Sequence, residues 1–157
     1  MRILVVAVGR VRGAMEAPVS DYEERAGRYW KLDVAEVEAG APGSGSPADR
    51  VKDAEAERIL ARIPSGFTVV ALTRTGKGMG SRELSEFLGG EAVRSAPGVS
   101  FVLGGAFGLA PRVLERADRR FSLSPMTLPH EMARLVLAEQ LYRAGTILRG
   151  EPYHKGA

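Results

Sequence analysis

Residues 99–111 read VSFVLGGAFGLAP, and this stretch decides how the rest of the chain is interpreted. The apolar run 99–103 predicts a buried strand, and glycines follow it at positions 104, 105 and 108. Pro111 then suits the first turn of a helix. A strand, a glycine-rich loop and a helix in this order are typical of a sheet with helices packed on its faces.

The same alternation extends in both directions along the chain. The run 3–8 is apolar throughout, which predicts a central strand buried on both faces. Further strands are expected at 32–37, 67–72 and 121–123, and helices at 18–29, 46–63, 81–90, 111–117 and 129–148. This order predicts an α/β fold with a mainly parallel sheet flanked by helices. Residues 40–47 (GAPGSGSP) are expected to form a mobile loop inside a single domain, 1–157.

Composition excludes several classes of protein. The chain has 157 residues, 45% of them hydrophobic and 26% charged, as in soluble globular domains. It contains no cysteine, which rules out disulfides, thiolate metal sites and cysteine nucleophiles. Its two histidines have no acidic cluster around them, so we expect no metal site. The first apolar run is too short for a signal peptide or a membrane span, which predicts a soluble, cytoplasmic protein.

The positive charge is confined to the last third of the chain. Up to Ala110 there are 14 basic and 14 acidic residues, whereas 8 basic and 5 acidic residues follow from Pro111 onward. An anionic partner that contacts this region would account for the imbalance. A solvated, arginine-rich helix face would account for it equally well.

Three strand ends carry residues suited to bind a ligand, because ligands of such sheets bind beyond the carboxyl ends of the strands. The glycines after residue 103 let backbone amides approach a ligand, although a tight turn would need them too. Residues 75–81 (TGKGMGS) lack the spacing of a nucleotide triphosphate loop. Residues 123–130 (LSPMTLPH) would form one wall of an apolar pocket.

The last helix and the tail leave alternatives open. Residues 129–148 are apolar around most of the helix, so this helix must be buried within the domain or against another subunit. His130 lies in its first turn, where local hydrogen bonding is the usual role of a histidine. The tail Tyr153-His154-Lys155 is either a frayed end or a functional segment.

Three segments together resemble the small SPOUT-class methyltransferases of bacterial ribosomes. They are LVVAVGR (4–10), LGGAFGL (103–109) and SLSPMTLPHEMARLVLAEQLYRAGTILRGEPYHK (122–155). The resemblance covers essentially the whole chain, and the third segment is the most specific. It implies methylation of N3 of a pseudouridine in 23S ribosomal RNA, with S-adenosylmethionine as the methyl donor.

The resemblance also implies a structure and a set of site residues. The expected fold is a sheet whose C-terminal segment is threaded into a deep trefoil knot, which forms the cofactor pocket. Two subunits are expected to pack through the last helix as a homodimer. By motif match, the cofactor would contact Leu72, Gly104, its neighbour Gly105, and the run Leu123, Ser124, Pro125, Met126, Thr127 and Leu128.

The implied chemistry needs groups that orient the pseudouridine and remove its N3 proton. The candidates are His154, Tyr153 and Arg143, with His154 as the general base and Arg143 as a partner for an anionic uracil oxygen. Two other functions are compatible with the sequence. One is a non-catalytic ribosomal RNA-binding module, and the other is an unrelated α/β enzyme that acts on a small nucleotide.

Overall fold

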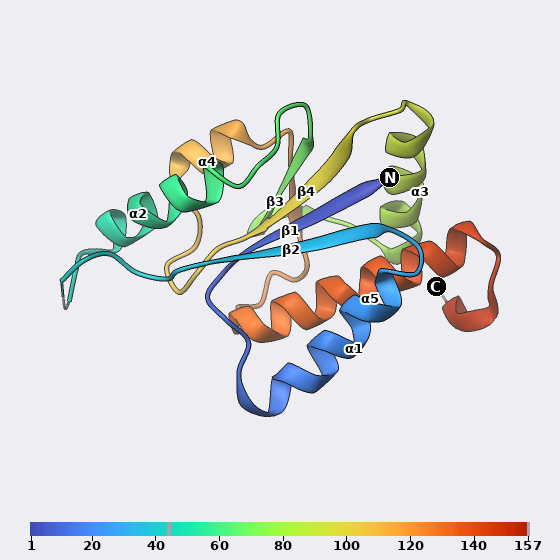
Figure 1. Cartoon of the computed structure of the whole chain (residues 1–157), viewed down its shortest axis with the longest axis horizontal. Coiled ribbons are helices and arrows are strands. Elements are labelled where there is room, and N and C mark those ends of the chain that lie inside the picture. The colour runs from blue at the N-terminus through green and yellow to red at the C-terminus, as the bar shows by residue number, and fades with distance from the viewer. Residues whose placement is uncertain (44, 157) are drawn as a thin grey trace.

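Five parallel strands form the sheet in the computed structural model, which describes residues 1–43 and 45–156 (Figure 1). Their order is β2-β1-β4-β3-β5. The strands are β1 (Arg2–Val8), β2 (Lys31–Val37), β3 (Thr68–Gly78), β4 (Gly98–Leu103) and β5 (Arg119–Ser122). The predicted α/β class and the parallel sheet are therefore confirmed.

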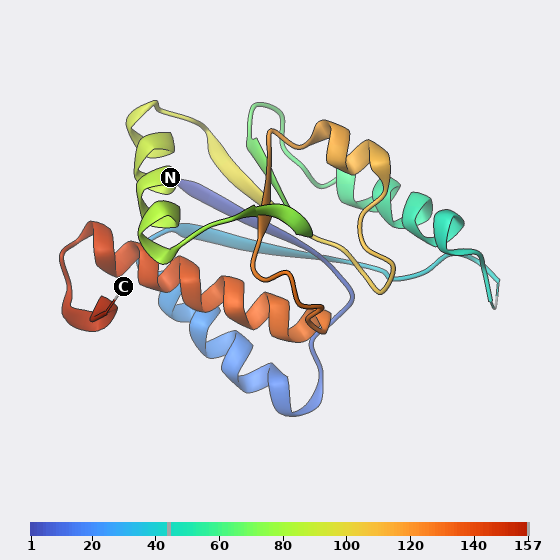
Figure 2. The same ribbon diagram turned by 180° about the vertical axis from the view of Figure 1, so that it is seen from behind.

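Helices cover both faces of the sheet (Figures 1 and 2). They are α1 (Glu16–Ala26), α2 (Ala48–Leu60), α3 (Ser81–Val93), α4 (Pro111–Arg116) and α5 (His130–Leu148), with short 3₁₀ helices at Gly13–Met15 and Pro152–His154. The first, third and fifth helices share one face, and α2 and α4 lie on the other. Among the described residues, no helix is long and apolar enough to cross a membrane.

Alternate residues of the central strands supply two separate cores, because successive side chains of a strand point to opposite faces. In β1, Ile3 and Val5 pack toward α1, α3 and α5, whereas Val6 and Val8 pack toward α2 and α4. The last helix closes the first core with Leu137 and Leu141, which are almost wholly buried. A core on each face is the reason that residues 3–8 are apolar without interruption.

Some element boundaries differ from those predicted. The helix α1 starts at Glu16, so Pro18 is its third residue, still within the turn whose N–H groups lack helical partners. Residues 73–78 extend β3 through an irregular register instead of forming a loop. Leu123 lies just beyond β5. In the expected loop 40–47, Ser44 lies outside the described residues, and the trefoil knot remains a prediction.

Candidate functional site

Leu72 lies at the point where three strand ends meet. It is paired with Leu103 of β4 on one side and with Phe121 of β5 on the other. Gly104 comes directly after Leu103, and Leu123 comes two residues after Phe121. The register of the sheet therefore brings three segments together at one carboxyl edge. The first and the last of them, at Leu72 and Leu123, are about 50 residues apart in sequence.

A cavity of about 250 Å³ opens beside this edge. Leu72 and Leu123 line it, but Gly104, Gly105 and residues 124–128 do not. Its other walls come from the β3–α3 connection, the sheet and α5, and comprise Met79, Gly80, Ser81, Leu84, Phe101, Phe121, Ser122, Val136, Leu137 and Gln140. The cavity is mostly apolar, and its polar side chains are Ser81, Ser122 and Gln140.

The two glycines after β4 are explained by the packing of their own loop. A Cβ on Gly104 would lie 2.8 Å from the carbonyl carbon of Gly108, and one on Gly105 would lie 3.0 Å from the Glu55 carboxylate and from Val8. The Gly108 N–H also donates to the Gly105 carbonyl at 3.1 Å. Gly104 is thus required by a tight turn and Gly105 by close packing against α2 and β1, so a bulky residue at 104 would distort the loop itself.

The loop between β5 and α5 leaves its backbone open to a ligand. Among the described residues, the backbone of the loop 124–128 forms one hydrogen bond, in which the Met126 N–H donates to Ser124 Oγ at 2.9 Å. The side chain of Met126 is 74% exposed. Backbone groups without internal partners need water or a ligand. This loop therefore offers donors and acceptors next to the apolar cavity.

A chain of hydrogen bonds leads from the cavity to the tail. The Ser81 hydroxyl donates to Gln140 Oε1 at 2.6 Å, and Gln140 Nε2 donates to Glu139 Oε2 at 2.7 Å. The other carboxylate oxygen, Glu139 Oε1, accepts from Arg143 Nη2 at 2.6 Å and from the Tyr153 hydroxyl at 3.0 Å. Glu139 thus holds together two of the three predicted catalytic side chains.

The tail packs on α5, which is not the arrangement of a frayed end. The ring of Tyr153 lies 4.5 Å from that of Tyr142, and the Arg143 guanidinium lies 4.8 Å from the Tyr153 ring centre. Burial and hydrogen bonds to Tyr22 and Glu139 raise the pKa of Tyr153 above its usual range. Tyr153 is therefore a protonated donor at neutral pH, suited to positioning Glu139 and Arg143 rather than to accepting a proton.

His154 differs from its neighbours because Nδ1 of its ring is buried and has no hydrogen-bond partner among the described residues. A buried polar atom without a partner is uncommon, and it is often completed by water or a ligand. Tyr153 and Arg143 are both hydrogen-bonded to Glu139, whereas His154 keeps one ring nitrogen without a partner.

The loop and the tail lie at opposite ends of α5 (Figures 1 and 2). Residues 124–128 lead into the start of the helix, whereas Arg143 is fourteen residues beyond Pro129, or about 20 Å along the axis at 1.5 Å per residue. One subunit by itself therefore holds the predicted cofactor loop and the predicted catalytic group apart.

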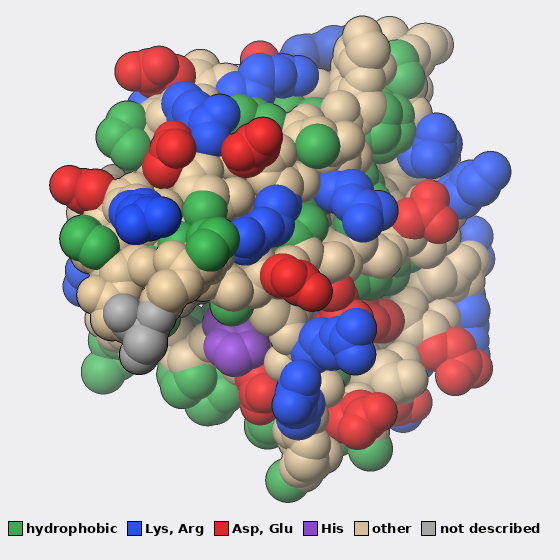
Figure 3. Space-filling model, turned by 60° about the vertical axis from the view of Figure 1, so that its left-hand side comes forward, with side chains coloured by type: hydrophobic (Ala, Val, Ile, Leu, Met, Phe, Trp, Pro, Cys, Tyr) green, Lys and Arg blue, Asp and Glu red, His purple; other side chains and the backbone are tan. Residues whose placement is uncertain are grey.

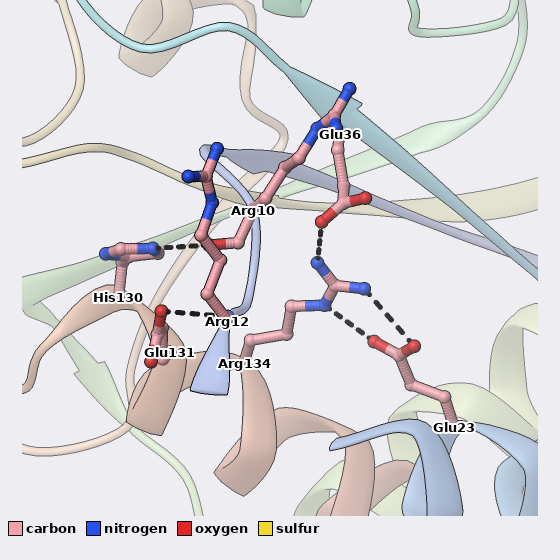
Figure 4. Close-up of polar contacts among 7 residues, drawn as sticks. All are labelled: Arg10, Arg12, Glu23, Glu36, His130, Glu131 and Arg134. Carbon is pink, nitrogen blue, oxygen red and sulfur yellow. Dashed lines mark hydrogen bonds and ion pairs between the residues drawn. The ribbon is translucent and has the colours of Figure 1, made fainter. Parts of the chain in front are cut away.

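A buried arginine fixes the start of α5 (Figure 4). Arg134 Nε donates to Glu23 Oε1 and Arg134 Nη1 donates to Glu36 Oε2, both at 2.7 Å. Burial disfavours the charge of Arg134, but these two carboxylates outweigh it and raise the pKa of the arginine. Nearby, His130 Nε2 lies 3.3 Å from the Arg10 carbonyl oxygen, the local role expected of that histidine. These contacts tie the helix that follows the loop to α1, β2 and the end of β1.

Comparison with known proteins gives the family. The family model described as "Predicted SPOUT methyltransferase" matches residues 1–154.

The chain belongs to the SPOUT methyltransferase family.

Similar SPOUT methyltransferases carry the name "Ribosomal RNA large subunit methyltransferase H". The protein of that name from Gemmatimonas aurantiaca is 53% identical over 99% of this chain and 100% of its own length. The one from Rubrobacter xylanophilus is 48% identical over 98% of this chain and 98% of its own length. The one from Carboxydothermus hydrogenoformans is 42% identical over 99% of this chain and 100% of its own length. Membership of this family is incompatible with an unrelated α/β enzyme that acts on small nucleotides.

SPOUT methyltransferases generally depend on S-adenosylmethionine, and the residues present fit this cofactor. The cavity supplies apolar walls at Leu72 and Leu123, and the loop 124–128 supplies free backbone groups beside them. Such a combination, apolar walls with a few polar groups, is usual for small-molecule sites. Among the described residues, no group of three or more His, Cys, Asp and Glu side chains is placed to hold a metal ion.

Sequence reasoning missed four side chains that organise this site. Ser81 is the first residue of α3 after the N-cap Gly80, and its hydroxyl bonds to Gln140. Glu139 and Arg134 are charged residues in an apolar helix, and each bonds to a side chain outside that helix. Glu139 accepts from Tyr153, and Arg134 donates to Glu23. The signal for both was a charge that interrupts an otherwise apolar stretch.

Proposed function

We propose that this chain methylates N3 of a pseudouridine in 23S ribosomal RNA, acting on the large subunit or the assembled ribosome in the cytoplasm, with residues 1–157 as one domain. The observation that carries the proposal is the full-length similarity to relatives named as large-subunit ribosomal RNA methyltransferases. The family and the packed tail argue against a non-catalytic RNA-binding module.

Leu72, Gly104, Gly105 and residues 123–128 would hold the cofactor. S-adenosylmethionine, when bound, supplies an electrophilic methyl group on a sulfonium sulfur. The chain must hold the pseudouridine so that N3 points at this methyl group, and alignment of this kind is worth about 7–11 kcal/mol in favourable cases. The apolar walls at Leu72 and Leu123 would exclude water from the reacting atoms.

The tail group would orient the uracil ring and take up the N3 proton. The imidazole of His154, whose buried Nδ1 has no hydrogen-bond partner among the described residues, would accept that proton. Arg143 uses Nε and Nη2 on Glu139, which leaves Nη1 free to donate to a uracil oxygen as negative charge develops. Tyr153 would keep Glu139 and Arg143 in this orientation.

The active unit in this proposal is a homodimer built on α5. About 20 Å of helix separates the loop 124–128 from Arg143 in one subunit, so the tail group next to this loop would come from the partner. The hydrogen bonds of Gln140 and Glu139 tie each tail to the cavity wall of its own subunit. Half-buried side chains of α5, among them Val136, which also lines the cavity, would form the contact between subunits.

Val136→Glu is expected to give folded monomers. Val136 is only partly covered within the subunit, so a charge there would disrupt the contact between subunits more than the core. Light scattering measures the mass, and circular dichroism checks the fold. Leu141→Glu is not an equivalent test, because Leu141 is wholly buried within its own subunit and a charge there would unfold the chain.

Val93→Glu is the matched control for this test. It places the same charge on an apolar side chain of α3 that is 86% exposed. Both the mass and the fold should stay as in the wild type. A stable dimer in the Val136→Glu protein would reject α5 as the interface.

Mass spectrometry of ribosomal RNA tests the proposed activity directly. Cells that lack this gene should lose one methyl group on a 23S pseudouridine, and restoring the gene should restore it. Purified protein with S-adenosylmethionine and large subunits from the deficient cells should give the same product. Unchanged RNA in both experiments would refute the proposal.

A further inference from the structure

Two paired segments at one edge of the sheet hold four cations and no carboxylate. The end of β3, residues 73–78, contributes Arg74 and Lys77, and β5 contributes Arg119 and Arg120. All four side chains are exposed. We call these four residues the β3–β5 basic edge.

These cations are not neutralised by ion pairs with other described residues. Arg119 lies over the ring of Phe87, and Arg120 Nη2 donates to the Leu114 carbonyl at 3.1 Å. Asp118, next to Arg119 in the chain, is engaged by Arg116 Nη1 at 3.6 Å and by the Val69 N–H at 2.8 Å. The positive charge of the edge is therefore available to an anionic partner.

Among the described residues, at least nine of the other basic side chains form ion pairs with acids. The face shown in Figure 3 has Lys and Arg side chains intermixed with Asp and Glu side chains. Examples are Arg25 with Asp21 at 3.1 Å and Arg112 with Asp53 at 3.0 Å. The four cations of the β3–β5 basic edge, by contrast, have no ion pair with a described acid.

The basic edge adjoins the cavity. The same two chain segments that carry the cations continue into its walls, β3 through Met79 and Gly80, and β5 through Ser122 and Leu123. They are also in close contact, since a Cβ on Gly76 would lie 2.7 Å from the backbone carbon of Phe121. An extended polyanion bound along the edge would pass directly beside the cavity opening.

We propose that the β3–β5 basic edge binds the phosphate backbone of the ribosomal RNA next to the target nucleotide. This inference rests on the proposed function for the identity of the RNA. Arginine forms paired hydrogen bonds with phosphate oxygens, and three of the four cations are arginines. Bound there, the RNA strand presents a base to the cavity while the tail approaches from the other subunit.

The test compares neutralised variants of the full-length protein. Arg74→Gln/Lys77→Gln and Arg119→Gln/Arg120→Gln each remove two charges from the edge. Arg50→Gln/Arg62→Gln is the matched control, because these exposed arginines on and after α2 form no hydrogen bond or ion pair with other described residues. The probes are protein-free 23S RNA and large subunits from cells lacking the gene, at 50–200 mM KCl.

Each edge variant should bind the RNA about tenfold more weakly at a given salt concentration. Because two phosphate contacts are lost, the slope of log K against log salt should also become shallower by about 1.4. The control should match the wild type, and all variants should keep the affinity for S-adenosylmethionine. With saturating subunits, the edge variants should raise KM and leave kcat within about twofold, as expected for uniform binding.

Three results would overturn the proposal. One is that the edge variants bind RNA with the same affinity and the same salt slope as the control. Aggregation of these variants would then mean that the four charges only protect an open strand edge. Another is weaker binding to subunits without weaker binding to protein-free RNA, which would identify a ribosomal protein as the partner. The third is wild-type binding without salt dependence. Absence of methylation by the wild type would instead refute the proposed function, and the binding data would still decide the role of the edge.

Discussion

A chain that ends after Glu151 is expected to bind S-adenosylmethionine normally and to methylate ribosomal RNA at least about 100-fold more slowly, the usual effect of removing a general base. The deletion removes Tyr153 and His154 but no residue of the cavity or of the loop 124–128. Calorimetry measures cofactor binding, and radiolabelled methyl transfer to large subunits measures turnover. Full-rate methylation by the truncated chain would eliminate the tail from the mechanism.

Single substitutions separate the roles within the tail. His154→Ala should lower kcat more than it weakens RNA binding, because the proton is transferred only in the transition state. Lys155→Ala, which changes an exposed side chain, is the control and should stay near the wild type. Gly104→Val is expected to distort the loop after β4 and so to impair cofactor binding. If the site is shared, mixing truncated subunits with Gly104→Val subunits should restore activity in heterodimers, since each defect lies in a different half of the site.

Replacing Arg134 with Met is expected to destabilise the protein by about 3 kcal/mol, the lower end of the range for breaking a buried ion pair. The substitution would leave Glu23 and Glu36 facing each other without the guanidinium between them. For a domain of this size, this corresponds to a drop in Tm of about 6–12 °C. Thermal unfolding followed by circular dichroism measures it.

Arg2→Met is the matched control for that experiment. Arg2 forms an ion pair with Asp33 at 3.6 Å, but both side chains are about half exposed. An exposed pair of this kind is worth about 0–1 kcal/mol. Equal losses in the two variants would show that burial of Arg134 does not matter to stability.

The sheet could be predicted because its strands are apolar for a local reason. The run 3–8 has a core on each side, and its observed bounds, Arg2–Val8, differ from the prediction by a single residue. The extension of β3 could not be predicted from local pattern. Residues 73–78 are polar and glycine-containing, and they are in a strand only because β5, more than 40 residues later, pairs with them.

The candidate site divides in the same way. Leu72 and Leu123 could be placed at one edge from strand ends and from the family resemblance. The grouping of Tyr153, Arg143 and Glu139 depends on a tail that folds back on its own helix, and no periodicity predicts such a contact. Arg134 is a similar case, since its partners Glu23 and Glu36 lie about 100 residues earlier in the chain.

The position of β5 at the border of the sheet has a consequence for biosynthesis. This border strand, which lies next to the cavity, is also the last strand that the ribosome produces. A nascent chain that has reached residue 110 contains four strands and Leu72, but neither the walls from Ser122 and Leu123 nor the helix that carries Arg143. The chain can therefore catalyse the reaction only after its final third has been translated. Shorter products of translation are partly folded but have no methyltransferase activity.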